Sequence, residues 1–221
     1  MTPAPTAVFF DFGGVIADSP FIALRRYEEA HGLPLDFLRQ TNAINPLDNA
    51  WAHFERGDID LNAFDAAFLA ETTARGHAVP GRDLLPLLAT PVRPGMVRVL
   101  DALREDVFLA CLTNNLPVGD GAGMSQDAVH AAAVHDAMSR FRFVLESSQA
   151  GVRKPEPAFY EKACEMAGVT PANVVFLDDL GINLKPARAL GMRTIKVTDP
   201  ELALDSLGEI LGRDLLTPYR G

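Results

Sequence analysis

The stretch AVFFDFGGVIAD (residues 7–18) decides the fold of this protein. Four apolar residues end abruptly at Asp11, and two glycines, Gly13 and Gly14, follow the acid. A short continuous apolar run of this kind is typical of a buried strand in a parallel sheet. Glycines directly after such a strand permit a tight turn and the close approach of a ligand. We therefore expect a buried strand that places a carboxylate at one edge of a sheet.

Further short apolar runs along the chain predict additional buried strands. They are VFLACLT (107–113), FRFVLES (141–147), VVFLDD (174–179) and RTIKV (193–197). Helical patterns lie between most of these runs, at 95–106, 155–168 and 181–192. Strands that alternate with helices predict an α/β fold, with a Rossmann-like parallel sheet flanked by helices on both faces.

Residues 19–90 interrupt this alternation. They contain no strong strand run and favour several helices, with apolar positions such as Trp51 and Phe64. The stretch TPVRPG (90–95) is typical of a linker that returns the chain to the sheet. The sequence thus predicts a core made of residues 1–18 and 91–221, with a helical cap of residues 19–90 inserted after the first strand.

A Gly-rich stretch, NLPVGDGAGMS (115–125), precedes a further helical pattern at 126–141. A surface connection and a contact with substrate are equally compatible with such a loop. The sequence leaves both interpretations open.

The composition limits the classes of partner. The chain has 221 residues, and 48% of them are hydrophobic, which is enough for a sizeable core. Its 20 basic and 29 acidic residues give a net charge of −9. This charge argues against a nucleic-acid groove or an anionic membrane surface as the main partner. A small phosphorylated molecule stays compatible, because it needs only local cations.

The two cysteines, Cys111 and Cys164, both lie in apolar stretches. This favours reduced, buried thiols over a disulfide or a metal site. The N-terminus lacks the pattern of a signal peptide, and no apolar run approaches the ~20 residues that cross a bilayer. We therefore expect a cytoplasmic protein, and a homodimer is compatible with this expectation.

Polar residues follow the predicted strands at the edge where ligands bind in open parallel sheets. In chain order they are Asp11, then Thr113, Asn114 and Asn115, then Lys154 after the run at 141–147, and finally Asp178 and Asp179. Each of these alone is a weak signal, because an Asp after a strand is often a helix cap. Together, in this order, they indicate a catalytic site.

These blocks carry a family resemblance. FFDFGGVI, LTNN, RKPE and FLDDLGIN resemble the haloacid dehalogenase-like hydrolase superfamily over nearly the whole chain. Within it, the chain is most similar to the N-terminal phosphatase domain of soluble epoxide hydrolase and its stand-alone bacterial relatives. The resemblance implies an aspartyl-phosphate mechanism, Mg²⁺ as cofactor, a mobile cap and a small phosphorylated molecule as substrate.

The resemblance also implies roles for individual residues. Asp11 would attack phosphorus and form a covalent intermediate. The Mg²⁺ ligands would be Asp11, the backbone carbonyl of Gly13 and Asp179. Asp178 would support the site without being one of the direct ligands. Thr113 and Lys154 would be catalytic, and Thr113, Asn114, Asn115 and Lys154 would bind the substrate phosphate. Asn183 would orient the acidic pair by hydrogen bonds.

Gly13 departs from the pattern of most phosphatases in this superfamily, which place a second aspartate there. That acid protonates the leaving alcohol, a contribution of about 10²–10⁴-fold. Three explanations remain: a phosphatase that manages without the acid, a dehalogenase-type hydrolase that needs none, or a weakly active binding domain. The pair Asp178 and Asp179 favours the phosphatase. Asp18 could supply the proton, although a capping role for Asp18 in the first cap helix is favoured.

The cap residues that contact substrate cannot be assigned from the sequence. The candidates are Arg25, Arg26, Arg39, Trp51 and His53. For each arginine, a solvated helix face is the commoner role, and for Trp51 it is core packing.

Overall fold

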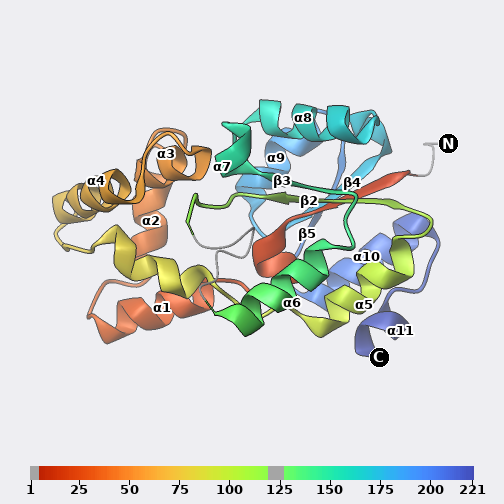
Figure 1. Ribbon diagram of the computed structural model, residues 1–221, viewed down its shortest axis with the longest axis horizontal. Helices are drawn as coiled ribbons and strands as arrows, with labels where there is room; N and C mark the ends of the chain where they lie inside the picture. Colours follow the sequence, from red (N-terminus) through yellow and green to blue (C-terminus); the bar gives the residue numbers. More distant parts are fainter. Residues whose placement is uncertain (1–4, 119–126) are drawn as a thin grey trace.

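A five-stranded parallel sheet forms the centre of the molecule, in the order β3-β2-β1-β4-β5 (Figure 1). The computed structural model describes residues 5–118 and 127–221. The strands are β1 (Ala7–Phe10), β2 (Phe108–Thr113), β3 (Phe143–Glu146), β4 (Val174–Asp178) and β5 (Arg193–Lys196). Each of them lies within an apolar run quoted above, so the predicted parallel sheet is confirmed.

Alternating side chains of the strands pack on opposite faces of the sheet. Val8 and Phe10 belong to one buried cluster, and Ala7 and Phe9 belong to another. The first cluster is covered by α5 (Pro94–Leu103), α6 (Ala128–Met138), α10 (Pro200–Leu211) and α11 (Leu216–Arg220). The second is covered by α8 (Pro157–Ala167) and α9 (Gly181–Ala189), and the short turns α7 (Ser147–Ala150) and η3 (Pro171–Asn173) complete the connections. Burial on both faces explains why the strands read as continuous apolar runs.

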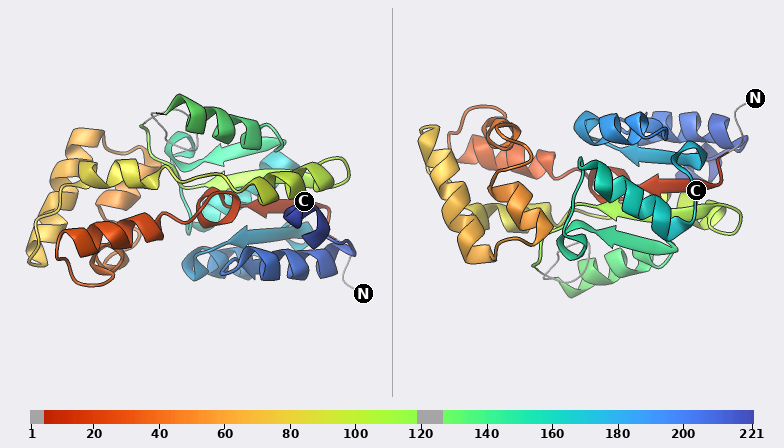
Figure 2. Two further views of the ribbon diagram at one scale, coloured as in Figure 1. Left: turned by 90° about the horizontal axis from the view of Figure 1, so that it is seen from below. Right: turned by 90° about the horizontal axis from the view of Figure 1, so that it is seen from above.

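Residues 21–88 form a group of helices, called the helical segment below, that lies beyond the carboxyl ends of the strands (Figures 1 and 2). It consists of α1 (Phe21–Ala30), α2 (Phe37–Ala43), α3 (Ala50–Arg56), α4 (Leu61–Ala74) and η2 (Gly81–Leu88). Its own buried cluster includes Phe54 and Phe64, whose rings stack with centroids 4.4 Å apart. The division into a core and a cap with boundaries at 18/19 and 90/91 stays a prediction.

Two adjacent stretches of chain connect the helical segment to the sheet. The Asp18 amide donates to the Pro91 carbonyl and the Arg93 amide to the Ile16 carbonyl, each at 2.9 Å. The Arg93 guanidinium also lies 2.9 Å from the Asp18 carboxylate. The favoured capping role of Asp18 is therefore wrong: α1 begins after Pro20 without a side-chain cap, and Asp18 ties the two linkers together.

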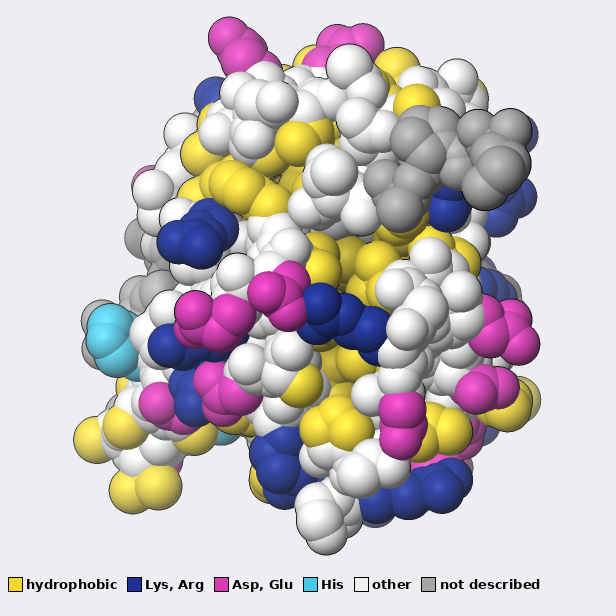
Figure 3. Space-filling view, turned by 90° about the vertical axis from the view of Figure 1, so that its right-hand side faces the viewer, with side chains coloured by type: hydrophobic (Ala, Val, Ile, Leu, Met, Phe, Trp, Pro, Cys, Tyr) yellow, Lys and Arg dark blue, Asp and Glu magenta, His cyan; other side chains and the backbone are white. Residues whose placement is uncertain are grey.

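The remaining expectations concern thiols and surfaces. Cys111 and Cys164 are buried and free, as expected. Among the described residues, none of the helices has the length and apolar character needed to cross a bilayer. At the end of the molecule opposite the helical segment, acidic and basic side chains are interspersed (Figure 3). Residues 119–126, which make up most of the predicted Gly-rich loop, lie outside the described residues.

Candidate active site

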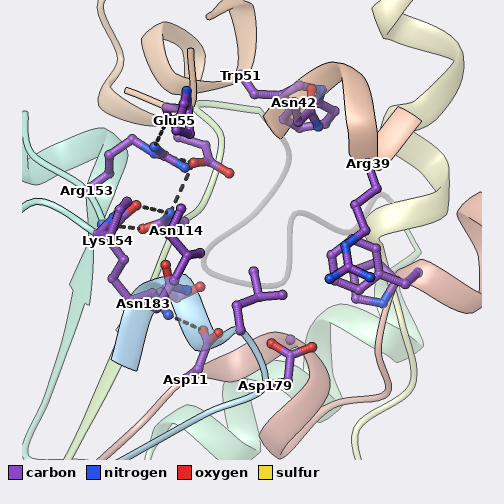
Figure 4. Close-up of a pocket in the computed structure, with 18 of the residues that line it drawn as sticks. Asp11, Arg39, Asn42, Trp51, Glu55, Asn114, Arg153, Lys154, Asp179 and Asn183 are labelled. Atoms are coloured by element: carbon purple, nitrogen blue, oxygen red, sulfur yellow. Dashed lines mark hydrogen bonds and ion pairs between the residues drawn. The ribbon is translucent and has the colours of Figure 1, made fainter. Parts of the chain in front are cut away.

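Asp11 follows β1 and Asp178 ends the neighbouring strand β4, so both lie at the carboxyl edge of the sheet. Figure 4 shows Asp11 at this edge, near Asp179. The ammonium of Lys154 lies between Asp11 and Asp178, 2.7 Å from Asp11 Oδ1 and 2.9 Å from Asp178 Oδ2. Lys154 is only 1% exposed and Asp178 is fully buried. The parallel sheet therefore brings these three predicted residues together in a buried ion cluster.

Burial and the excess of negative charge together shift the pKa values of the cluster. Burial raises the pKa of Asp11 well above its ordinary value; Lys154 lowers it, and Asp178 and Asp179 raise it further. Burial also raises the pKa of Asp179 to about 6, with Asp178 adding to the effect. Burial lowers the pKa of Lys154, but the carboxylates of Asp11 and Asp178 outweigh it and hold that pKa above its usual range. Three acids sharing one buried cation favour the arrival of a second cation.

The three acids are close enough to hold a metal ion together. One carboxylate oxygen each of Asp11, Asp178 and Asp179 lies within 4.8 Å of the others. The oxygens of Asp178 already accept from the Leu180 amide at 2.8 Å and from Asn183 Nδ2 at 3.1 Å. Asn183 thus makes the expected hydrogen bonds to one member of the acidic pair, Asp178, and its orienting role stays a prediction. Asp11 and Asp179 are consequently better placed than Asp178 to offer oxygens to a cation.

The turn after β1, η1 (Phe12–Ile16), brings its backbone against Asp179. Gly14 has φ +78°, and a Cβ there would lie 2.3 Å from Asp179 Oδ2. Only glycine fits both the conformation and the space. Gly13 differs, because its φ of −66° suits any residue and a Cβ would meet only Pro20 Cδ, at 3.8 Å. The absence of a side chain at position 13 is therefore not required by the backbone.

The end of β2 contributes Thr113 and Asn114 to the site. Thr113 is 4% exposed and lines the same cavity as Asp11. The Asn114 side chain donates to the Lys154 carbonyl and accepts from the Lys154 amide, each at 2.9 Å. It also donates to Glu55 at 3.1 Å. Asn114 thus lines the cavity and fixes the loop that carries the buried lysine.

Asn115 does not line the cavity with its neighbours. Its amide oxygen accepts from the backbone and hydroxyl of Ser148, and its amide nitrogen donates to Glu146. Its backbone amide donates to Ser147 Oγ at 3.1 Å. Because these bonds occupy both ends of the side-chain amide, Asn115 holds the turn after β3, and we leave it out of the proposed site.

A cavity of about 460 Å³ separates the strand ends from the helical segment. Apolar side chains of the helical segment form much of its wall, among them Phe21, Leu24 and Trp51. Such a concave, largely apolar cavity with a few convergent polar groups is the common form of a small-molecule site. The charged cluster lies at one end of the cavity, and its apolar part is suited to the rest of a substrate.

The structure shows which of the candidate substrate-contacting residues of the cap line the cavity. Trp51 and Arg39 line the cavity. Arg25 instead lies 3.6 Å from Asp36, and His53 contacts two acids of the helical segment. Arg26 is exposed and outside the lining.

Two lining residues, Glu55 and Arg153, were missed in the sequence. Arg153 Nε donates to Glu55 Oε2 at 2.5 Å, and its NH1 donates to the Pro46 carbonyl at 3.0 Å. A second ion pair, Arg56 with Glu156 at 3.0 Å, also joins the helical segment to the core. Glu55 lies one helical turn after Trp51, and this spacing could have indicated that both side chains share a helix face. Nothing in the sequence identified Arg153 as the partner of Glu55.

Comparisons with known proteins bear on the family of this chain. A family profile described as haloacid dehalogenase-like hydrolase matches residues 5–191. Bifunctional epoxide hydrolase 2 of Rattus norvegicus is 32% identical over 215 residues, which are 92% of this chain. The match covers 38% of that relative, so this chain spans about two fifths of its length. Flavin mononucleotide hydrolase 1 of Arabidopsis thaliana is 28% identical over 84% of this chain and 69% of that protein.

Solved structures show the same fold at low sequence identity. A HAD family enzyme of Bacteroides thetaiotaomicron, in complex with magnesium and inorganic phosphate, has a TM-score of 0.56 and 22% identity, covering 87% of this chain and 93% of its own. The L-2-haloacid dehalogenase of Xanthobacter autotrophicus, with chloropropionic acid covalently bound, has a TM-score of 0.59 and 21% identity, covering 98% and 87%. At these identities, the two structures support the fold and leave the reaction open.

Proposed function

This chain belongs to the haloacid dehalogenase-like hydrolase family, and on that basis we propose that it is a Mg²⁺-dependent phosphatase acting on a small phosphorylated molecule. The observation that carries the proposal is the cluster of Asp11, Asp178 and Asp179 around the buried Lys154. Phosphoryl transfer needs an oxygen nucleophile, charge neutralisation and positioning, and the cluster offers residues for each. The similarity to a hydrolase of flavin mononucleotide, a phosphate ester, is compatible with the same reaction class.

In the proposed mechanism, Asp11 attacks the phosphorus atom and the bond to the leaving oxygen breaks. This forms an aspartyl phosphate and an alcohol, which takes its proton from water. A water molecule then attacks the phosphorus, releases inorganic phosphate and restores the Asp11 carboxylate. Lys154, 2.7 Å from Asp11, lowers the repulsion between the carboxylate and the phosphate. Thr113 at the end of β2 is proposed to bind a phosphate oxygen.

The donor set fits Mg²⁺, which takes oxygen ligands in octahedral geometry. We propose that the ion is held by Asp11, Asp179 and the Gly13 carbonyl. Asp178 would not hold it directly but would orient Lys154 and Asn183. Bound Mg²⁺ would neutralise charge between the phosphate and the carboxylates. Burial and the neighbouring Asp178 raise the pKa of Asp179 to about 6, and a bound cation would favour its ionised form.

Gly13 restricts the expected substrates. Without an acid at this position, the leaving alcohol receives no proton from the residue that supplies it in most relatives. Asp18 does not replace it, because Asp18 pairs with Arg93 in the linkers and does not line the cavity. We therefore propose that the enzyme favours esters whose leaving groups depart readily.

A dehalogenase is the second candidate, and Gly13 is the observation that favours it, because a halide leaves without a proton. In that reaction Asp11 would displace the halide and form a carboxylic ester, which water would hydrolyse. Release of chloride from 2-chloropropionate, with no release of phosphate from phosphate esters, would select this candidate.

The experiment that tests the phosphatase is hydrolysis of p-nitrophenyl phosphate by the purified protein. We expect turnover with Mg²⁺, loss of turnover on chelation, and a loss of at least about 10⁴-fold in Asp11→Asn. Asp205→Asn, an exposed acid on α10, is the matched control and should keep full activity. If the wild-type protein bound phosphate esters but hydrolysed none of a broad panel, the phosphatase proposal would be refuted. The protein would then be interpreted as a domain that binds such a ligand.

A further inference from the structure

Six charged side chains line the cavity within the described part of the chain: Asp11, Arg39, Glu55, Arg153, Lys154 and Asp179. Four of them form ion pairs with one another, Lys154 with Asp11 at 2.7 Å and Arg153 with Glu55 at 2.5 Å. The other two are Asp179 and Arg39. The proposed Mg²⁺ site accounts for Asp179, so Arg39 is left with a positive charge that the proposed reaction does not use.

The Arg39 side chain extends from α2 into the cavity (Figure 4). Its guanidinium lies 5.7 Å from the centroid of the Phe21 ring, which also lines the cavity. A contact with the face of a ring leaves the five N–H donors of an arginine free to bond in the plane of the group. Arg39 is exposed, so water can reach these donors until a ligand binds. Within residues 5–118 and 127–221, Arg39 has no ion pair with a carboxylate, whereas Arg153 and Lys154 both do.

The same wall of the cavity contains two further polar residues whose bonding is incomplete. Trp51 and Asn42 line it, and Figure 4 shows them near Arg39 on the side of the helical segment. Trp51 Nε1 and Asn42 Oδ1 are buried and have no hydrogen-bond partner among the described residues. Buried polar groups are nearly always paired in proteins, so these two groups depart from the usual pattern. This wall therefore contains polar side chains, which a binding site for a plain hydrocarbon would lack.

We propose that Arg39 recognises a second negatively charged group, a carboxylate or a second phosphate, on the leaving group of the substrate. The inference rests on the proposed phosphatase function and names its substrate class: a phosphate monoester with an apolar body and an anionic group away from the ester. Arginine suits this role because its planar N–H donors match the oxygens of a carboxylate or a phosphate. The apolar side chains between the two ends, Phe21 and Leu24 among them, would contact the body of the substrate.

Two matched pairs of substrates test this specificity. The first is the phosphate ester of 3-(4-hydroxyphenyl)propanoate and that of the corresponding propanamide, which differ in charge but hardly in size. The second is 1,4-phenylene bisphosphate and phenyl phosphate, both esters of phenols, so that the two pairs distinguish the two anionic groups. We expect the wild type to prefer the more charged member of at least one pair by about tenfold or more in kcat/KM.

The variants compared are Arg39→Gln, Arg39→Lys and the control Arg26→Gln, which changes an exposed arginine outside the cavity lining. Arg39→Gln should abolish the preference while keeping hydrolysis of the neutral amide, Arg39→Lys should restore part of it, and Arg26→Gln should leave it unchanged. Equal rates within both pairs, or a preference that survives Arg39→Gln, would overturn the proposal for Arg39. Absence of hydrolysis of every ester, including p-nitrophenyl phosphate, would instead overturn the phosphatase and the substrate class with it.

Discussion

The two ends of the cavity differ in how completely their polar side chains are paired. At the strand ends, Lys154 contacts two carboxylates, and Asp178 also accepts bonds from the Leu180 amide and Asn183. At the wall of the helical segment, Arg39 has only a ring contact and Trp51 Nε1 has no partner among the described residues. The first end is arranged before anything binds, as a site for a reaction common to many substrates requires. The second end leaves the exposed guanidinium of Arg39 available for a particular ligand.

The largest effect is expected when the ammonium group of Lys154 is removed from the cluster at the strand ends. Lys154→Met would leave Asp11 and Asp178 buried without their shared partner, which typically costs about 3–5 kcal/mol of folding free energy. Urea unfolding in EDTA, compared with the wild type, measures this loss. Lys185→Met, an exposed lysine on α9, is the control and should change stability by less than about 0.5 kcal/mol. A similar small change for both variants would show that the cluster is not held by its lysine.

A second test adds to the site the acid that Gly13 lacks. Because φ is −66° and a Cβ would meet only Pro20 Cδ at 3.8 Å, Gly13→Asp should fold normally. We expect turnover of alkyl phosphates, which have poor leaving groups, to rise by about 10²-fold, and turnover of p-nitrophenyl phosphate to change little. Steady-state kinetics on both substrates measures the difference.

Gly13→Asn is the matched control, because it has the same shape without the acid. An equal rise in both variants would mean that the effect comes from packing. No rise in Gly13→Asp would mean that proton transfer does not limit the reaction.

The smallest expected effect tests whether the acids at the strand ends carry more negative charge than Lys154 balances. Asp179 has a raised pKa, about 6, so its ionised form is disfavoured in the folded protein. At pH 7 and without metal, Asp179→Asn should therefore stabilise the fold by about 1 kcal/mol and lose the rise in Tm that Mg²⁺ gives the wild type. The gain should vanish below about pH 4, where the acid is protonated in both folded and unfolded states. A destabilised variant in EDTA would contradict this electrostatic account.

The sequence alone predicted the sheet, its flanking helices and the grouping of Asp11, Lys154, Asp178 and Asp179. These predictions succeeded because parallel strands buried on both faces give uninterrupted apolar runs, and their carboxyl ends share one edge of the sheet. The chain order of the blocks was then enough to place the acids near one another. The exact partners of each side chain did not follow from the same argument.

Only the tertiary structure decided which of several equivalent polar residues enter the cavity. Asn114 lines it while the adjacent Asn115 bonds to Ser148, and of the two exposed residues Arg39 and Arg26 only Arg39 lines it. The difference has a physical reason: strand ends are fixed by the pattern of apolar residues, whereas the face that a short helix presents depends on packing between elements distant in sequence. The pairing of Glu55 with Arg153, 98 residues apart, is of this second kind.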